Sequence, residues 1–477
     1  MLKKQTTLSS QDWLQRGEKP AVFTADEKIS YRELAIRVNA RCLHLRRLDF
    51  VPGNRCALYV KPSAAAIETL LAMWSLGIIA VPVNTRLPDA RVKEMLNSIN
   101  CTHALCDDDF SDRAPTAFTL QELVSAGAEK ALIDVHMPLS APATIIFTSG
   151  STGYGKACLH TIGNHVYSAL GSNENIRLQS GDAWLLALPL YHVSGIAILF
   201  RCLLAGAAIA VPDANISLDE NVAFLGATHL SLVAAQLDAL LQETKSIENL
   251  GHLKAILLGG SAIPQALIKK AIENGLPIVT SYGSTEMSSQ ITTTRPGDSP
   301  EKVKTSGRLL KYRELKIAQN GEIWVRGETL FQGYLNNIGL QSAVDENGWF
   351  HTGDLGRMDS DGYLRVFGRK DNMFISGGEN IFPEEIERAL EQLPGVVRAL
   401  VIPVDDARFG KRPVAFVHML EGYSTHNIDR HALRHVLPGY KIPDFIFPLP
   451  QDGYHVKPDR KLLQQRAKEL LQSIRST

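Results

Sequence analysis

The sequence predicts an α/β protein: a large N-terminal domain of parallel-sheet α/β subdomains plus a β-subdomain, hinged to a small α+β C-terminal domain. Up to about residue 300, short β-branched runs alternate with amphipathic stretches, which is typical of parallel strands joined by helices. From residue 307 to about 368, short alternating strands are separated by Gly and Asn turns, which indicates antiparallel pairing. The residues that follow have strands and a helix of their own.

The alternation of strands and helices is clearest at two places in the N-terminal domain. A strand is predicted over residues 56–60 (CALYV), a helix over 64–77, and a second strand over 78–83 (IIAVPV). A chain of 477 residues is too long for one hydrophobic core, so repeated layers of this kind are expected. The second strand–helix–strand series is predicted at 255–258, 265–273 and 278–281.

A charged segment, Arg369-Lys370-Asp371, separates the two predicted domains. It precedes ISGGENIFPEEIERALEQL, in which a glycine turn leads to a proline at the start of a helix. Strands are then predicted over 396–403 and 413–419. We therefore place the N-terminal domain at residues 1–368, the hinge at 369–371 and the mobile C-terminal domain at 372–477.

The charge balance gives no reason to expect nucleic acid, because Lys plus Arg and Asp plus Glu number 50 each. The apolar stretch 185–211 is interrupted by Pro189, His192, Ser194 and Arg201, so we expect a strand end, a loop and a buried helix, with no membrane span. The six cysteines form no C-x-x-C pair and are expected to be reduced thiols of a cytoplasmic protein.

A glycine-rich loop follows a predicted strand in Thr144–Lys156, TIIFTSGSTGYGK, where backbone N–H groups, hydroxyls and a lysine can surround phosphate oxygens. Residues 150–156 also fit the pattern G-x-x-x-x-G-K. A P-loop needs Ser or Thr next to hold Mg²⁺, but this chain has Ala157 there. The following residues, ACLHT, indicate a strand and not a helix, so a P-loop ATPase or kinase is disfavoured.

FTSGSTGYGK resembles the phosphate-binding loop of the adenylate-forming superfamily, which includes acyl-CoA synthetases, luciferases and peptide-synthetase adenylation domains. Gly155 stands where that family usually has proline, which loosens the loop but keeps the lysine charge. Four further segments resemble its motifs in the right order, across essentially the whole chain. They are LGGSA at 258–262, SYGSTE at 281–286, HTGD at 351–354, and GRKD with SGGE between 368 and 379.

This resemblance implies ATP, Mg²⁺ and coenzyme A as cofactors. It places adenine against Gly259-Gly260-Ser261 and against Tyr282-Gly283, and the α-phosphate at Thr285. It also implies that Glu286 holds Mg²⁺ through oxygen ligation. The phosphate-binding residues it implies are Thr148, Ser149, Gly150, Ser151, Thr152, Gly153 and Lys156.

The same resemblance implies that Asp354 accepts hydrogen bonds from both ribose hydroxyls and that Arg369 contacts the ribose. The loop at Gly377-Gly378 would meet coenzyme A after a rotation about the hinge. The family also uses a lysine near the C-terminus that bridges the carboxylate and the α-phosphate. The K-x-x-R spacing favours Lys457, and Lys461 remains the alternative, although it indicates the start of a terminal amphipathic helix.

The segment PLYHVSG at 189–195 resembles the family motif that lines the acyl site. The resemblance gives His192 the role of an aromatic gate between the ATP side and the CoA side, and places Ser194, Gly195 and Ser284 near the acid. Arg201 lies in IAILFRCLLAGAA, where a buried guanidinium is costly without an anion, although an internal ion pair or a surface position would also satisfy it.

The surrounding sequence closely resembles the o-succinylbenzoate–CoA ligases of menaquinone biosynthesis, whose substrate has two carboxylates. One carboxylate is activated, and Arg201 would bind the aromatic one. The implied reaction converts o-succinylbenzoate, ATP and CoA into o-succinylbenzoyl-CoA, AMP and diphosphate through an acyl-adenylate. The alternatives are another aryl- or acyl-CoA ligase of this superfamily, or a non-catalytic nucleotide-binding protein, and an oligomer of identical chains stays open.

Overall fold

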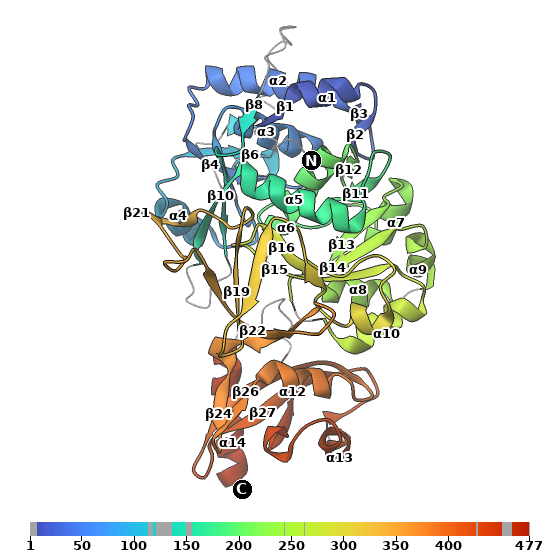
Figure 1. The fold of residues 1–477 in the computed structure, drawn as a ribbon, viewed down its shortest axis with the longest axis vertical. Helices are drawn as coiled ribbons and strands as arrows, with labels where there is room; N and C mark the ends of the chain where they lie inside the picture. The colour runs from blue at the N-terminus through green and yellow to red at the C-terminus, as the bar shows by residue number, and fades with distance from the viewer. Residues whose placement is uncertain are drawn as a thin grey trace.

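The computed structural model describes residues 7–112, 118–120, 136–148, 155–242, 244–261, 263–425, 428–450 and 460–476. The chain forms a large N-terminal domain, drawn at the top of Figure 1, and a smaller C-terminal domain below it. The N-terminal domain contains two large mixed sheets and a smaller antiparallel sheet. The predicted fold class is therefore confirmed.

The first sheet has eight strands, and five of them, β9, β5, β4, β6 and β7, run parallel to one another. Strands β10, β20 and β21 extend it by antiparallel pairing. In sheet order the strands are β21 (Gly339–Gln341), β20 (Gly333–Asn336), β10 (Ala157–Thr161), β9 (Pro142–Phe147), β5 (Ile79–Pro82), β4 (Arg55–Tyr59), β6 (His103–Cys106) and β7 (Phe118–Thr119).

The second sheet has nine strands, of which the six from β15 to β2 are parallel and the others pair antiparallel at its edges. In sheet order the strands are β17 (Arg308–Leu309), β16 (Ser289–Thr293), β15 (Ile278–Ser284), β14 (Ala255–Leu258), β13 (His229–Leu232), β11 (Ala183–Leu185), β12 (Ala208–Ala210), β2 (Pro20–Phe23) and β3 (Lys28–Ser30).

One continuous core contains side chains from both sheets and from the helices between them. Trp74 of α3 and Phe200 of α6 meet with ring centroids 4.9 Å apart, and His165 of α5 stacks on the same phenylalanine. The core helices are α2 (Tyr31–Arg47), α3 (Ala64–Ser75), α5 (Ile162–Ile176) and α6 (Val193–Ala205).

Shorter helices and strands surround this core. The helices are α1 (Ser10–Arg16), α4 (Asp89–Asn97), α7 (Leu218–Phe224), α8 (Ala234–Leu240), α9 (Thr244–Leu250), α10 (Gln265–Glu273) and α11 (Pro300–Val303). A separate pair is formed by β1 (Thr7–Ser9) and β8 (His136–Pro138), which are antiparallel. The two predicted strand–helix–strand series therefore correspond to β4–α3–β5 and β14–α10–β15.

The predicted β-subdomain is only partly one sheet. Strands β18 (Arg313–Ile317), β19 (Glu322–Gly327), β22 (Phe350–Met358) and β23 (Leu364–Arg369) form an antiparallel sheet in that order. Strands β20 and β21 instead leave this segment and join the eight-stranded sheet, where Leu335 pairs with Ala157. Pairing along β10 satisfies backbone groups that would otherwise be unpaired at the sheet edge, and sequence alternation does not reveal this choice.

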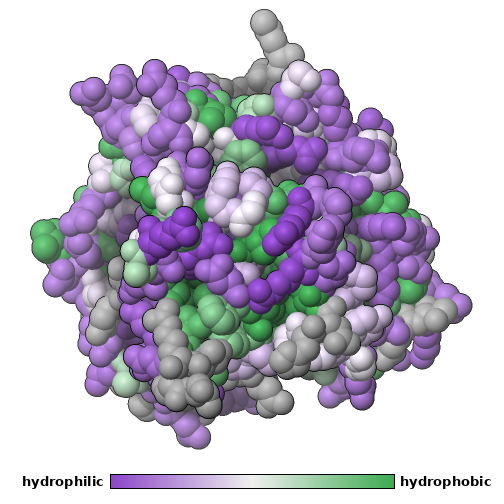
Figure 2. All heavy atoms as spheres, turned by 90° about the horizontal axis from the view of Figure 1, so that it is seen from below, coloured by the Kyte–Doolittle hydropathy of each residue, from purple (hydrophilic) through white to green (hydrophobic). Residues whose placement is uncertain are grey.

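The small domain is α+β, as predicted. Its sheet has the order β26 (Val396–Asp406), β27 (Gly410–Met419) and β28 (Phe445–Pro448), and a hairpin joins β24 (Phe374–Ser376) to β25 (Glu379–Ile381). Its helices are α12 (Pro383–Leu390), α13 (Arg430–Arg434) and α14 (Arg460–Ser476). Figure 2 views the molecule from this end, and hydrophilic residues cover most of the visible face.

The apolar stretch 185–211 forms the end of β11, a loop and helix α6, as expected from its interruptions, and then strand β12, which was not predicted. Among the described residues, no helix is both long and apolar enough to cross a membrane. All six cysteines are free thiols, and five of them are buried.

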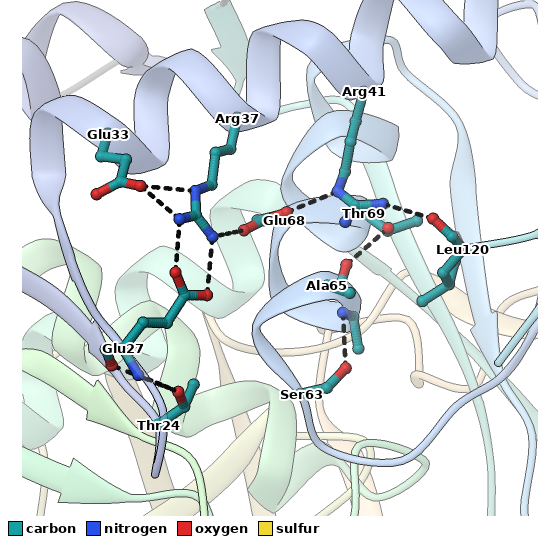
Figure 3. A network of polar contacts seen from close by, with 11 residues as sticks. Thr24, Glu27, Glu33, Arg37, Arg41, Ser63, Ala65, Glu68, Thr69 and Leu120 are labelled. Carbon is teal, nitrogen blue, oxygen red and sulfur yellow. Dashed lines mark hydrogen bonds and ion pairs between the residues drawn. The ribbon is translucent and has the colours of Figure 1, made fainter. Parts of the chain in front are cut away.

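A buried carboxylate joins α2 to α3 (Figure 3). Glu68 of α3 is 4% exposed and forms ion pairs with Arg41 at 2.8 Å and with Arg37 at 3.4 Å. Arg41 also donates to the backbone oxygen of Leu120, and Arg37 pairs with Glu27 at 2.6 Å. These contacts satisfy both arginines within the fold.

Candidate active site

Three of the predicted nucleotide residues meet where β15, β22 and β23 come together. The Tyr282 hydroxyl donates to Asp354 Oδ2 at 2.6 Å, and Arg369 Nη1 lies 3.2 Å from Asp354 Oδ1. Burial raises the pKa of the Asp354 carboxyl, and the contacts from Tyr282 and Arg369 oppose that rise. The carboxylate is therefore held in place by two donors, one from β15 of the nine-stranded sheet and one from the adjacent strand β23.

Gly353 makes room for this contact. It adopts φ of +70°, and a Cβ atom built there would lie 2.9 Å from Arg369 Nη2. Arg369 Nη1 also donates to the Thr352 backbone oxygen at 2.8 Å. A glycine before the aspartate thus allows the guanidinium to lie directly against the strand.

Glu286 lies in the turn after β15, close to the glycine-rich segment. Its Oε1 accepts a hydrogen bond from the Tyr334 hydroxyl at 2.9 Å, and Lys156 Nζ lies 4.6 Å from the centroid of the same tyrosine ring. The Thr148 and Lys156 backbones bond to each other, with Thr148 N donating to Lys156 O at 2.9 Å. The two ends of the loop are thereby closed, while residues 149–154, which hold five predicted phosphate ligands, lie outside the described residues.

The donor set at Glu286 fits a Mg²⁺ ion bound together with a nucleotide. Among the described residues, no group of three or more His, Cys, Asp or Glu side chains could hold a metal alone. Mg²⁺ in nucleotide sites is commonly held by one or two carboxylates together with phosphate oxygens. Glu286 could supply one such carboxylate, and Lys156, whose ammonium lies over the ring of Tyr334, could bind phosphate.

A histidine that sequence reasoning missed supports this turn. His160 Nε2 donates to the Thr285 backbone oxygen at 2.7 Å, and its ring also contacts Thr144, whose hydroxyl lies 2.8 Å from His165 Nε2. Burial lowers the pKa of His160 to about 4, so it stays neutral near pH 7. His160 therefore fixes the peptide that joins Thr285 to Glu286.

Two predicted glycines are required by close approaches. A Cβ atom at Gly259 would lie 2.7 Å from Ser281 Oγ, and one at Gly283 would lie 1.9 Å from the Ser289 backbone oxygen. Gly260 has φ of +84°, and Ser261 follows it after β14. Packing within the fold therefore requires glycine at positions 259 and 283, and Gly260 and Gly283 are exposed at the ends of β14 and β15.

Three of the predicted acid-side residues, His192, Ser194 and Gly195, lie at the start of α6. His192 precedes the helix as its N-cap residue, is exposed, and its ring centroid is 4.7 Å from that of Tyr191. A Cβ atom at Gly195 would lie 2.3 Å from the Pro189 backbone oxygen, and Ser194 is half-buried beside it. Ser284 Oγ accepts from Met287 N at 3.3 Å in the turn that also holds Glu286.

Arg201 is buried in α6 with 1% of its surface exposed. Its Nη2 donates to Gln290 Oε1 at 2.7 Å and to Ser289 Oγ at 3.2 Å, and its guanidinium lies 5.0 Å from the Trp184 ring centroid. Its Nε is buried without a hydrogen-bond partner. No ion pair with Arg201 is formed by the described residues, and burial lowers its pKa to about 10.

The predicted residues of the small domain are Gly377, Gly378 and the two candidate lysines, Lys457 and Lys461. Gly377 and Gly378 form the turn between β24 and β25 with φ of +58° and +88°, and Gly377 N donates to Phe409 O. Lys457 lies outside the described residues. Lys461 lies in the first turn of α14, as its sequence context predicted.

Comparisons with known proteins give a consistent result. The chain matches the family model described as AMP-binding enzyme over residues 10–335, and the model for the AMP-binding enzyme C-terminal domain over residues 385–452. The 2-succinylbenzoate–CoA ligase of Bacillus cereus is 32% identical over 472 residues, which covers 96% of each chain.

Two solved structures extend the likeness to three dimensions. The o-succinylbenzoate CoA synthetase (MenE) from Bacillus subtilis, in complex with the acyl-adenylate intermediate OSB-AMP, has a TM-score of 0.85 and 31% identity, covering 96% of this chain and 98% of that one. The same protein in complex with ATP and magnesium ion has a TM-score of 0.82 and 31% identity, covering 93% and 96%.

Proposed function

We propose that this chain, which belongs to the family of AMP-binding enzymes, is an o-succinylbenzoate–CoA ligase. It is an AMP-forming acid–CoA ligase that joins o-succinylbenzoate to coenzyme A at the expense of ATP. The observation that carries the choice of acid is Arg201, which is buried without a carboxylate partner among the described residues. A substrate with a second carboxylate would supply that partner.

In the first half-reaction, an oxygen of the aliphatic carboxylate attacks the α-phosphorus of ATP, and the bond to diphosphate breaks. The Tyr282–Asp354–Arg369 contacts support binding of adenine and ribose in this arrangement. Thr285 and Lys156 would bind phosphate oxygens, and Lys457 would bridge the carboxylate and the α-phosphate. These groups act by positioning the reactants and offsetting negative charge.

Mg²⁺ would be held by Glu286 together with phosphate oxygens, and when bound it would offset the charge of the departing diphosphate. The Glu286 carboxylate is prepared for this role by two neighbours. Tyr334 donates to one of its oxygens, and His160 fixes the preceding peptide.

In the second half-reaction, the sulfur of coenzyme A attacks the carbonyl carbon of the acyl-adenylate. The bond from that carbon to the bridging oxygen breaks, and AMP leaves with this oxygen. We propose that the small domain rotates about residues 369–371, which removes Lys457 and brings the Gly377-Gly378 loop to the CoA channel. His192, exposed at the start of α6, would act as the gate between the ATP side and the CoA side, and its ring would move when the enzyme passes from adenylation to thioester formation. Lys370 in the hinge forms an ion pair with Glu322 of β19 at 3.2 Å, and rotation of the small domain would break this pair.

At the acid site, Arg201 would bind the aromatic carboxylate, with Ser194, Gly195 and Ser284 lining the space between it and the reacting carboxylate. A guanidinium suits a carboxylate because its planar donors match two oxygens at once.

We also propose that the enzyme works in the cytoplasm, where its six free cysteines stay reduced.

The proposal is tested by a panel of acids supplied with ATP, Mg²⁺ and CoA, with AMP release and acyl-CoA formation as readouts. The panel contains o-succinylbenzoate, benzoylpropionate (which lacks the ring carboxylate), benzoate and a fatty acid. We expect o-succinylbenzoate to have the highest kcat/KM. A higher value for another acid would refute the substrate, and no AMP release with any acid would refute the ligase assignment.

A further inference from the structure

A second arginine is buried beside Arg201. Arg313 begins strand β18 and is 5% exposed. Its Nε donates to the Gln290 backbone oxygen at 2.6 Å, its Nη1 to the Lys311 backbone oxygen at 2.7 Å, and its Nη2 to Ser168 at 3.1 Å. All these partners are neutral oxygens.

Helix α5 leaves space for this side chain at Gly171. A Cβ atom built there would lie 2.5 Å from Arg313 Nη1 and 2.8 Å from the Lys311 backbone oxygen. Any larger residue would displace the guanidinium or the strand. The helix and the arginine therefore fit each other at this point.

Gln290 of β16 connects the two arginines. Its backbone oxygen accepts from Arg313, and its side-chain Oε1 accepts from Arg201 at 2.7 Å. Its Nε2 donates to Thr293 Oγ1 at 2.7 Å, which fixes the side-chain amide with its oxygen toward Arg201. The preceding Ser289, the other partner of Arg201, has a positive φ of 108°, which is costly for a residue with a side chain.

The two guanidiniums form a pair of buried cations without a counterion among the described residues. Burial, followed by the charge of Arg201, lowers the pKa of Arg313 to about 9. Like charges in a poorly solvated interior repel each other, so the fold holds this pair against an electrostatic cost. The strained backbone at Ser289 adds to that cost, and both features are typical of functional sites.

We propose that Arg313 is a positioning residue for acid recognition, which holds Arg201 through Gln290 and adds a second positive charge to the receptor for the second carboxylate of a diacid. The inference rests on the proposed function and goes beyond it, because the hydrogen bonds of Arg313 described above go to the protein itself, so that it acts through its neighbours.

The first test compares Arg313→Gln and Arg313→Lys with the native enzyme on o-succinylbenzoate and benzoylpropionate. For Arg313→Gln we expect the KM for the diacid to rise about tenfold, and the KM for ATP and for the monoacid to stay within about threefold. Arg313→Lys should recover part of the loss because it keeps the charge. Arg326→Gln is the matched control, because it removes an exposed arginine paired with Glu314 in the same sheet.

The second test does not require the loss of Arg313. Gln290→Glu keeps the shape of the side chain and gives Arg201 an internal carboxylate, which would compete with that of the substrate. We expect unchanged or higher thermal stability together with an increase of about tenfold or more in the KM for the diacid. An unchanged KM for the diacid in both Gln290→Glu and Arg313→Gln would overturn the inference, and so would equal losses on both acids.

A failure of the proposed function is distinguished by a double-mutant cycle of Arg201→Met and Arg313→Gln, read on the acid that the native enzyme uses best. If that acid is not o-succinylbenzoate, the proposed substrate is wrong. Coupling of about tenfold in the KM for that acid still supports the link between the two arginines, and coupling below about twofold overturns it.

Discussion

Arg41 and Arg201 are both buried arginines on core helices, and they differ in what surrounds the charge. Arg41 lies 2.8 Å from the buried carboxylate of Glu68, which also binds Arg37 (Figure 3). Within the described part of the chain, Arg201 has a serine hydroxyl and an amide oxygen as its side-chain hydrogen-bond acceptors, and no carboxylate. The fold completes the first site by itself, whereas the second is completed by a ligand if the proposed function is right.

This difference separates charges that stabilise from charges that recognise. A buried pair that loses one partner leaves an uncompensated ion, so the Glu68 network is expected to be sensitive to substitution. A buried ion that is already uncompensated has less to lose on removal. Stability and activity should therefore respond in opposite ways at the two sites.

The largest effect is expected at Lys457, a cation that, like Arg201, we assign to the reaction and not to the stability of the fold. Lys457→Ala should abolish adenylation and leave thioester formation from a supplied acyl-adenylate largely intact, because we assign this lysine to the first half-reaction only. Diphosphate exchange and acyl-adenylate consumption measure the two halves separately. Normal adenylation by Lys457→Ala, with loss in Lys461→Ala, would transfer the role to Lys461.

The next effect sharpens the comparison itself. Glu68→Gln should lower the free energy of unfolding by about 3–5 kcal/mol, because Arg41 would be left buried without its anion. Arg201→Met should lower it by about 1 kcal/mol or less, since no ion pair is lost. Denaturant unfolding of both variants measures the two values. Equal destabilisation would contradict the distinction between the two sites.

A smaller effect is expected at the nucleotide site. Asp354→Ala should weaken ATP binding by about 2–4 kcal/mol, because a carboxylate that accepts from two ribose hydroxyls makes two charge-assisted hydrogen bonds. Tyr282→Phe removes only the hydroxyl that bonds to Asp354 and should lose less. Calorimetry with ATP gives both affinities, and unchanged binding in Asp354→Ala would remove that residue from the site.

The smallest effect is expected at a solvated ion pair. Lys61 and Asp109 lie 2.6 Å apart with side chains 62% and 64% exposed. Solvent screens such pairs, so Lys61→Ala should change the free energy of unfolding by about 1 kcal/mol or less. Denaturant unfolding on the scale used for Glu68→Gln provides the reference, and a loss comparable to that variant would show that burial does not govern these pairs.

Local patterns predicted much of the fold. Strands such as β14 and helices such as α10 could be predicted from the sequence, because the period of the hydrophobic residues distinguishes a strand from a helix without knowledge of distant contacts. The pairing of β20 with β10 could not be predicted, because alternation of apolar and polar residues identifies a strand but not the sheet edge that it joins.

The candidate site shows the same limit. Motif residues such as Tyr282, Asp354 and Arg369 were identified together by resemblance, and the structure brings them into contact. Nothing in the sequence indicated the roles of His160 and Arg313, because both residues lie in ordinary short strands. Both roles depend on hydrogen bonds to backbone oxygens more than twenty residues away. A buried charge or histidine acquires its meaning from tertiary partners that sequence spacing does not report.

The most direct test of the account measures kcat/KM for two enzymes, native and Arg201→Ala, on two acids, o-succinylbenzoate and benzoylpropionate. We predict that the substitution lowers kcat/KM for the diacid by about 10²–10³-fold or more, because its ring carboxylate would be buried without a cation. The native enzyme should use the monoacid poorly, and that acid should lose far less on substitution. Equal losses on the two acids would show that Arg201 serves the fold, as Arg41 does, and would contradict the account.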